Sequence, residues 1–262
     1  MSFRKLNLAI LGVKPMRIHK VDDKRALSLL AAERVVQVIQ EKPDAVLGLS
    51  TGETPLGMYR ELVRLHKEEG LDFSRVRTFN LDEYVGLSPD HPQSYHYYMH
   101  HNFFRHINIA PENIHIPNGN VSDFERESKA YEEAIKKVGG IDLQILGIGT
   151  NGHIGFNEPG SEPTSSTRVV SLTERTRRDN SRFFPSIEEM PTHAVTLGIQ
   201  TILKYSKSIL LLANGEKKAE AIYRMVEGEI TPEIPASYLR THPDVTVIVD
   251  QEAGKKIKVT TG

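Results

Sequence analysis

The sequence predicts an α/β fold: a doubly wound, mainly parallel open sheet with helices on both faces, of the Rossmann-like kind. Two observations predict it. Short apolar runs alternate with segments whose apolar side chains recur at helical spacing, which is typical of buried parallel strands joined by crossover helices. The chain also has 262 residues, of which 39% are hydrophobic and 26% charged, so it is long enough to bury a substantial core.

Each predicted element has its own signal in the sequence. Helical spacing of apolar residues predicts a helix over 22–40, which Lys42-Pro43-Asp44 ends. Pro55 opens a second helix that continues to about residue 67, because proline is favoured in the first turn. Further helical patterns lie near 93–106 and 122–138. We expect strands at the apolar runs 45–50, 76–81, 143–148, 194–197, 208–213 and 245–250.

The sequence is expected to comprise an extension, residues 1–15, and one α/β domain, residues 16–262. The apolar run Leu6–Leu11 is too short for a secretory signal, and Lys14–Arg17 stands where small cleavage-site residues belong. The chain contains no cysteine, which excludes disulfides, thiolate zinc sites and cysteine nucleophiles. These features favour a reducing, cytoplasmic location.

The charge pattern bears on the partners of the chain. The formal net charge is −1, with basic and acidic residues intermixed. No basic block predicts nucleic-acid binding. No run approaches the roughly 20 apolar residues that a membrane-spanning helix needs. We therefore expect a small-molecule partner, with no nucleic acid and no membrane, and the sequence leaves open whether the chain forms a homo-oligomer.

Four polar motifs directly follow predicted strands. They are Thr51–Pro55, Asp82–Tyr84, Gly149–His153 and Asn214–Lys218. In open α/β sheets, ligands bind outside the carboxyl ends of the strands. Any one motif alone has the composition of a turn, but together they predict one binding crevice.

Two glycine-containing motifs invite comparison with nucleotide sites. Thr51–Pro55 joins a strand to a helix, where backbone N–H groups and the helix N-terminus suit a phosphate; the alternative is an ordinary capped helix start. It lacks the Gly-Lys-Ser/Thr of a nucleotide P-loop. Gly147–Gly152 matches the dinucleotide fingerprint, but 153–167 contains two prolines and two further glycines instead of a helix. No nucleotide cofactor is expected.

An imidazole and carboxylates are the candidate acid–base groups. His153 and Glu158 lie five residues apart in a glycine-rich loop, where the carboxylate can orient the imidazole. A lone histidine is more often a buried structural residue, and no second histidine lies at metal-ligand spacing from it. Asp82, with Glu83 beside it, is a candidate general base; the alternative is a turn cap. No metal is expected.

Cationic side chains near two predicted helices suit a phosphate ligand. Arg177, Arg178 and Arg182 follow Thr173, and Lys218 lies near another helix start. Without further information, solvent exposure is the expectation for most of them.

Three strings carry a resemblance to a known family. Leu81–Leu87, Gly152–Gly160 and Asn180–Phe184 resemble the glucosamine-6-phosphate deaminase family, and the similarity extends over about 16–250. The string Gly-His-Ile-x-Phe-Asn-Glu-Pro is highly specific. The related 6-phosphogluconolactonases share the fold and the phosphate loop but lack this string together with Asp-Glu-Tyr.

The resemblance implies a reaction: glucosamine 6-phosphate and water give fructose 6-phosphate and ammonia, in amino-sugar (N-acetylglucosamine) catabolism, by general acid–base catalysis. It implies that His153, assisted by Asn151 and Glu158, opens the sugar ring. Asp82 then moves a proton from C2 to C1, and water hydrolyses the resulting imine. Neither metal nor cofactor is implied. The residues implied to hold the phosphate are Thr51, Gly52, Thr54, Arg177 and Lys218.

The chain departs from the usual family pattern at three positions. Where this chain has Glu53, Ser166 and Asp179, the family usually has Gly, Arg and a small residue, respectively. Asn151, where many members carry Asp, also occurs in the family. The resemblance implies that Glu53 and Asp179 put negative charge near the phosphate loop and the Arg177 helix, which bears on substrate affinity or identity. Ser166 predicts weak or absent activation by N-acetylglucosamine 6-phosphate. The alternatives are a 6-phosphogluconolactonase-like hydrolase, an isomerase of another hexosamine 6-phosphate, and a non-catalytic sugar-phosphate sensor.

Overall fold

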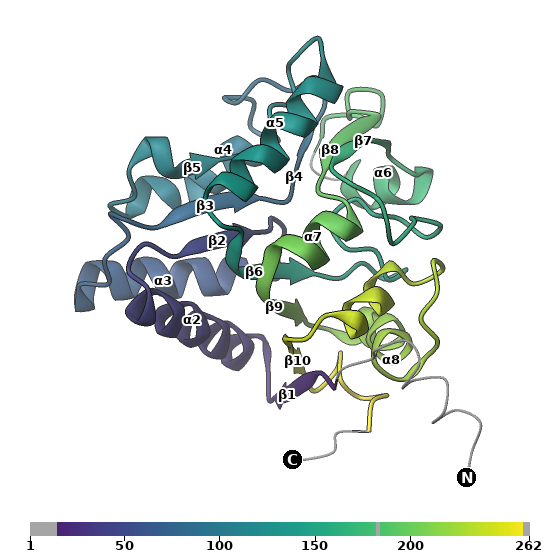
Figure 1. Cartoon of the computed structure of the whole chain (residues 1–262). Coiled ribbons are helices and arrows are strands. Elements are labelled where there is room, and N and C mark those ends of the chain that lie inside the picture. The colour runs from purple at the N-terminus through teal and green to yellow at the C-terminus, as the bar shows by residue number, and fades with distance from the viewer. Residues whose placement is uncertain (1–14, 182–183, 259–262) are drawn as a thin grey trace.

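The structure, a computed structural model, describes residues 15–181 and 184–258 (Figure 1). Within these residues, seven strands form one sheet in the order β1-β10-β9-β6-β2-β3-β5, and every neighbouring pair is parallel. The predicted doubly wound parallel sheet is confirmed. The strands are β1 (Arg17–Val21), β2 (Val46–Leu49), β3 (Arg77–Asn80), β5 (Ile114–His115), β6 (Ile141–Gly147), β9 (Ser206–Ala213) and β10 (Val245–Asp250).

Helices cover both faces of this sheet (Figure 1). They are α2 (Lys24–Glu41), α3 (Leu56–Glu69), α4 (Tyr95–Asn102), α5 (Phe124–Lys137), α7 (Ile199–Tyr205) and α8 (Ala219–Glu227). Helix α6 (Glu174–Ser181) lies to one side of this sheet (Figure 1). Short 3-10 helices add η1 (Phe104–His106), η2 (Pro111–Asn113), η3 (Glu216–Lys218) and η4 (Pro235–Thr241).

The two faces of the sheet make two separate apolar clusters. Successive strand residues point to opposite faces, so Val46 packs with residues of α5, α7 and α8, whereas Leu47 packs with residues of α2, α3 and α4. Leu211 and Leu212 divide in the same way on β9. Burial on both faces explains why the central strands read as continuous apolar runs.

A second, small sheet was not predicted. β4 (Asp82–Tyr84), β8 (His193–Thr196) and β7 (Arg168–Ser171) pair antiparallel in the order β4-β8-β7. The run 194–197 is a strand as predicted, but it belongs to this sheet and not to the parallel one. Its apolar pattern indicates a buried strand without indicating the partner. A third apolar cluster, which includes Tyr84 and Phe156, packs here.

Several boundaries differ from the prediction. The edge strand β1 has mostly exposed and charged residues, so no apolar run reveals it. The helix predicted over 93–106 ends at Asn102 and continues as η1. Of the predicted extension 1–15, residues 1–14 lie outside the described residues. In the part of the chain that the structure describes, every helix is too short or too polar to cross a membrane.

Candidate active site

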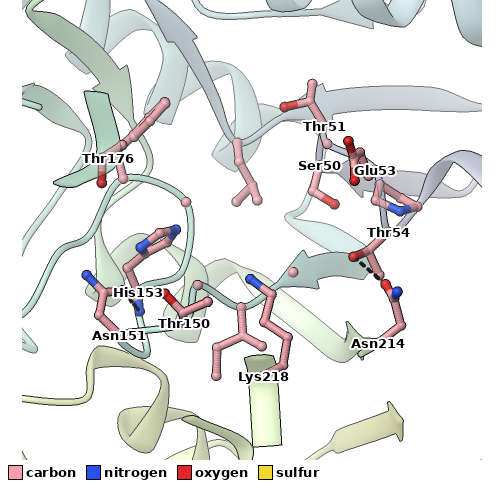
Figure 2. A pocket seen from close by; sticks show the side chains of 18 of the residues that line it. Ser50, Thr51, Glu53, Thr54, Thr150, Asn151, His153, Thr176, Asn214 and Lys218 are labelled. Atoms are coloured by element: carbon pink, nitrogen blue, oxygen red, sulfur yellow. Dashed lines mark hydrogen bonds between the residues drawn. The ribbon is translucent and has the colours of Figure 1, made fainter. Parts of the chain in front are cut away.

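A cleft of about 890 Å³ opens at the carboxyl ends of the central strands (Figure 2). It lies where β2 and β6 are neighbours and the chain winds outwards in opposite directions, which is the topological switch point of such sheets. The structure thus brings the four predicted motifs to one crevice. The lining residues are 50–55, 81–82, 147–151 and 214–218, with Tyr95, His153, Gly155, Phe156 and Thr176.

The loop after β2 forms one wall of the cleft. Two tyrosine hydroxyls hold its carbonyl groups in place. The Tyr59 hydroxyl donates to Ser50 O at 2.6 Å, and the Tyr98 hydroxyl donates to Gly52 O at 2.6 Å. Gly52 has φ 103°, a conformation that other residues rarely adopt. The loop geometry therefore depends on this glycine.

The same loop leads directly into α3, whose N-terminus carries no side-chain cap. The Thr54 hydroxyl donates to Asn214 Oδ1 at 2.8 Å instead of capping the helix. The first N–H groups of a helix without such a cap are suited to bind an anion, and the helix dipole favours negative charge there. This geometry favours the phosphate interpretation of the loop over the capped helix start.

Lys218 reaches the cleft from η3, at the start of α8. The turn before it is fixed, because the Gly215 N–H donates to both carboxylate oxygens of Asp250 at 3.0 Å. Figure 2 shows Lys218 between the wall that carries Thr51 and Thr54 and the wall that carries His153. A cation there faces the uncapped start of α3 across the same cleft.

His153 lies on the opposite wall, and its ring packs on Gly149. A Cβ atom at Gly149 would lie only 2.2 Å from an atom of the imidazole ring, so a larger residue would displace the ring. His153 Nδ1 lies 3.7 Å from Glu158 Oε2. Nδ1 thus faces this carboxylate, which can orient the imidazole ring.

Glu158 lies behind the imidazole and is fixed by two donors. Asn151 Nδ2 donates to Glu158 Oε2 at 2.7 Å, and the Thr176 hydroxyl donates to Oε1. The backbone N–H of His153 donates to Asn151 Oδ1 at 3.2 Å. Glu158 itself does not line the cleft. Asn151, His153 and Glu158 therefore form one connected group.

Asp82 is the first residue of β4 and lines the cleft, although only 6% of its surface is exposed. Burial raises the pKa of this carboxyl to about 8, and the neighbouring charge of Glu83 adds to the rise. The loop after β6 approaches closely, since a Cβ atom at Gly155 would lie 3.4 Å from Asp82 Oδ2. A carboxyl with a pKa near neutrality is suited to both accept and return a proton.

Glu83 is not part of the cleft, so the predicted acidic pair does not act together there. Its carboxylate accepts the N–H groups of Tyr84, Tyr95 and His96 at 2.8 to 2.9 Å. Burial raises the pKa of Glu83, against the opposing effect of these hydrogen bonds. Glu83 caps the start of α4 and thereby positions Tyr95.

The arginines of α6 do not line the cleft. Arg177 Nη2 donates to Ile187 O at 2.6 Å, and Arg178 pairs with Glu174 at 3.1 Å on the surface. Arg182 lies outside the described residues, and so does the side chain of Asp179. Of the five residues that the resemblance implies for phosphate binding, the structure places Thr51, Gly52, Thr54 and Lys218 in the cleft and Arg177 outside it.

Two cleft residues were missed in the sequence. Tyr95 lines the cleft from the first position of α4, with its ring parallel to that of Phe156 at a centroid distance of 6.1 Å. Thr176 reaches it from α6. Both stand in helical segments where nothing in the local pattern distinguishes them from packing residues.

Ser166 is exposed, and its carbonyl accepts a hydrogen bond from Arg168 at 3.2 Å.

The fold and the cleft together define the class of the protein, an α/β enzyme with a cleft at the carboxyl ends of its central strands. A buried carboxyl and an oriented imidazole share one cleft with a lysine and an uncapped helix start. Within 15–181 and 184–258, no three His, Asp or Glu side chains gather as metal ligands.

Residues 22–248 match the family described as glucosamine-6-phosphate isomerases/6-phosphogluconolactonase, and the chain belongs to this family. A glucosamine-6-phosphate deaminase of Thermoanaerobacter pseudethanolicus is 59% identical over 231 residues, which cover 88% of this chain and 91% of that protein. One of Clostridium acetobutylicum is 55% identical over 242 residues, covering 92% and 100%.

Solved structures agree with the sequence comparison. A structure described as a monomeric glucosamine-6-phosphate deaminase superposes with a TM-score of 0.90 at 52% identity and covers 92% of this chain and all of that one. A 6-phosphogluconolactonase of Trypanosoma cruzi superposes with a TM-score of 0.74 at 22% identity, covering 95% and 98%. The second similarity shows the shared fold alone.

Proposed function

We propose that this chain converts glucosamine 6-phosphate and water to fructose 6-phosphate and ammonia. The observation that carries the proposal is that Asp82 and His153, which lie 71 residues apart in the sequence, line one cleft. The named relatives support the choice of substrate.

Ring opening is the first step, and His153 carries it. The imidazole takes the proton of the anomeric hydroxyl and supplies one to the ring oxygen, so the C1–O5 bond breaks and the open-chain aldehyde forms. Glu158 faces Nδ1 at 3.7 Å and stabilises the imidazolium that exists between the two transfers. Asn151 cannot hold a negative charge, so its part is to position Glu158 and the backbone of His153.

Asp82 carries the isomerisation. It takes the proton from C2 while the carbonyl oxygen O1 takes one from the ammonium group, which gives an enolamine with a hydroxyl on C1, and it then returns a proton to C1. The product is an imine at C2, which water converts to the ketone with release of ammonia. The C–N bond is therefore cleaved hydrolytically after an internal oxidation–reduction between C1 and C2, which requires no external oxidant.

The raised pKa of Asp82 is compatible with its role as a base. The substrate carries an ammonium group on C2, and an opposite charge within about 4 to 6 Å of a carboxyl favours the ionised form. Substrate binding is thus expected to lower the pKa of Asp82 from about 8 and to generate the carboxylate where the base is needed.

Phosphate binding falls to the start of α3, the hydroxyls of Thr51 and Thr54, and Lys218. For Arg177 to contribute, its guanidinium has to leave the carbonyl of Ile187 and move into the cleft. We propose that a bound phosphate provides the stronger acceptor, because charge-assisted hydrogen bonds are roughly twice as strong as neutral ones.

Ammonia and fructose 6-phosphate, measured together, test this proposal. The purified chain is incubated with glucosamine, galactosamine and mannosamine 6-phosphates, and separately with 6-phosphogluconolactone. We expect equimolar ammonia and fructose 6-phosphate from glucosamine 6-phosphate. Hydrolysis of the lactone without ammonia release would favour the hydrolase alternative, and binding without turnover of any sugar would favour a sensor.

A further inference from the structure

The outer part of α4 carries a histidine pair that the proposed reaction does not use. His96 and His100 stand four residues apart, so they lie on the same face of the helix, one turn apart. Their ring centroids are 4.5 Å apart, with an angle of 31° between the ring planes. Both side chains are half-buried, and neither lines the cleft.

A backbone carbonyl fixes the orientation and the tautomer of His96. Its Nδ1 lies 3.2 Å from Pro89 O. A carbonyl oxygen only accepts hydrogen bonds, so Nδ1 is the donor here, and Nε2 is the ring nitrogen left for a metal ion. Metal-binding histidines typically donate their other ring N–H to a backbone carbonyl or a carboxylate in this manner. The Nε2 atom of His96 is therefore prepared to bind a cation.

An aromatic contact restricts the side chain of His100. Its ring packs edge-on against Phe104 at a centroid distance of 5.5 Å. This contact limits the rotation of the imidazole beside His96.

From this geometry we propose that His96 and His100 bind a divalent transition-metal ion through one imidazole nitrogen each. Two histidines at i and i+4 on a helix supply two of the zinc ligands in metalloprotease helices. Imidazole ligands suit Zn²⁺, Ni²⁺ and Cu²⁺, and affinity rises from Ni²⁺ to Cu²⁺ in the usual order. Water completes the coordination, because no third His, Asp or Glu of the described residues closes the site.

The site would stabilise the start of α4. The backbone N–H of His96 donates to Glu83 Oε2 at 2.9 Å, and the preceding residue, Tyr95, lines the cleft. A metal bound by His96 and His100 joins the first and second turns of this helix. Metal binding is therefore expected to stabilise α4 against unfolding and to raise the melting temperature of the chain.

Titration of the purified chain with Zn²⁺ by calorimetry tests the proposal, using His100→Gln and a matched control, His101→Gln. His101 lies on the same helix but outside the pair. We expect one ion per chain, at least about tenfold weaker binding in His100→Gln, and less than about twofold change in His101→Gln. The EPR spectrum of bound Cu²⁺ is expected to show two imidazole nitrogens in the chain and one in His100→Gln.

Circular dichroism and turnover of glucosamine 6-phosphate report whether each variant is folded. Equal Zn²⁺ affinity in the unaltered chain and in His100→Gln would overturn the proposal, and so would an equal loss in both variants. Absence of Zn²⁺ binding at millimolar concentration in the unaltered chain would also overturn it. These outcomes do not depend on whether the chain deaminates glucosamine 6-phosphate.

Discussion

Replacing Asp82 by Asn keeps the size and polarity of the side chain but removes the carboxyl that we propose exchanges protons with C2 and C1. A positioned proton transfer contributes about 10² to 10⁴ in rate. We therefore expect kcat to fall by about that factor, which corresponds to roughly 3 to 5 kcal/mol. Binding of glucosamine 6-phosphate should remain, because the residues that we propose bind the phosphate, Thr51, Thr54 and Lys218, are unchanged in this variant.

The same substitution has an opposite effect on stability. The pKa of Asp82 is about 8 in the folded chain and about 3.8 in the absence of its surroundings. Below pH 3.8 both states are protonated. As the pH rises from 3.8 to 8, the unfolded chain loses this proton while the folded chain keeps it, so the free energy of unfolding falls. At pH 7 the fall is about 4 kcal/mol, at about 1.4 kcal/mol for each pH unit.

Asn carries no ionisable proton, so the free energy of unfolding of the Asp82→Asn variant does not fall with pH for this reason. We expect its free energy of unfolding at pH 7 to exceed that of the unaltered chain by up to about 4 kcal/mol, with the difference vanishing near pH 4. Denaturant unfolding at pH 4, 5.5 and 7 measures this, alongside kcat and substrate affinity. Near-normal turnover would refute the assignment of the base. An unchanged stability difference between pH 4 and pH 7 would refute the buried, protonated state.

Four further predictions concern Glu158, Glu53, Arg177 and Ser166. Glu158→Gln should lower kcat by about 10- to 100-fold with a smaller effect on KM, because the imidazolium of His153 loses its counter-charge; equal kcat in steady-state assays would contradict this. Glu53→Gly should lower KM several-fold, because two like charges about 4 Å apart in water repel by about 1 kcal/mol. An unchanged KM would contradict a repulsion between Glu53 and the phosphate. Arg177→Gln should raise KM by roughly 10-fold or more if the guanidinium reaches the phosphate, and initial-rate measurements decide this. With serine at Ser166, N-acetylglucosamine 6-phosphate should not activate, and a sigmoidal rate curve that this compound straightens would contradict that expectation.

The sheet could be predicted because its central strands are buried on both faces. Each buried strand reads as an apolar run, and each crossover helix reads at helical spacing. Strand β1 was missed because it lies at the edge and is mostly exposed. The small antiparallel sheet was missed because pairing of β4 with β8 joins segments about 110 residues apart, and no local pattern encodes such a partner.

The cleft was predictable where its residues follow strand ends, as Asp82 and His153 do. Tyr95 and Thr176 were missed because they enter from helices, where a cleft-facing residue looks like a packing residue. Glu83 was misassigned for a related reason. Its partners, the N–H groups of Tyr95 and His96, lie 12 and 13 residues away, and only the folded chain brings them to its carboxylate.

A structure of the chain with an open-chain substrate analogue, 2-amino-2-deoxyglucitol 6-phosphate, would show whether Asp82 and His153 act on the same sugar. We expect the phosphate at the start of α3 and beside Lys218, with C1 and C2 of the analogue between the Asp82 carboxyl and the imidazole of His153. A phosphate bound beside His153, or an analogue whose C1 and C2 lie beyond hydrogen-bonding reach of both side chains, would contradict it.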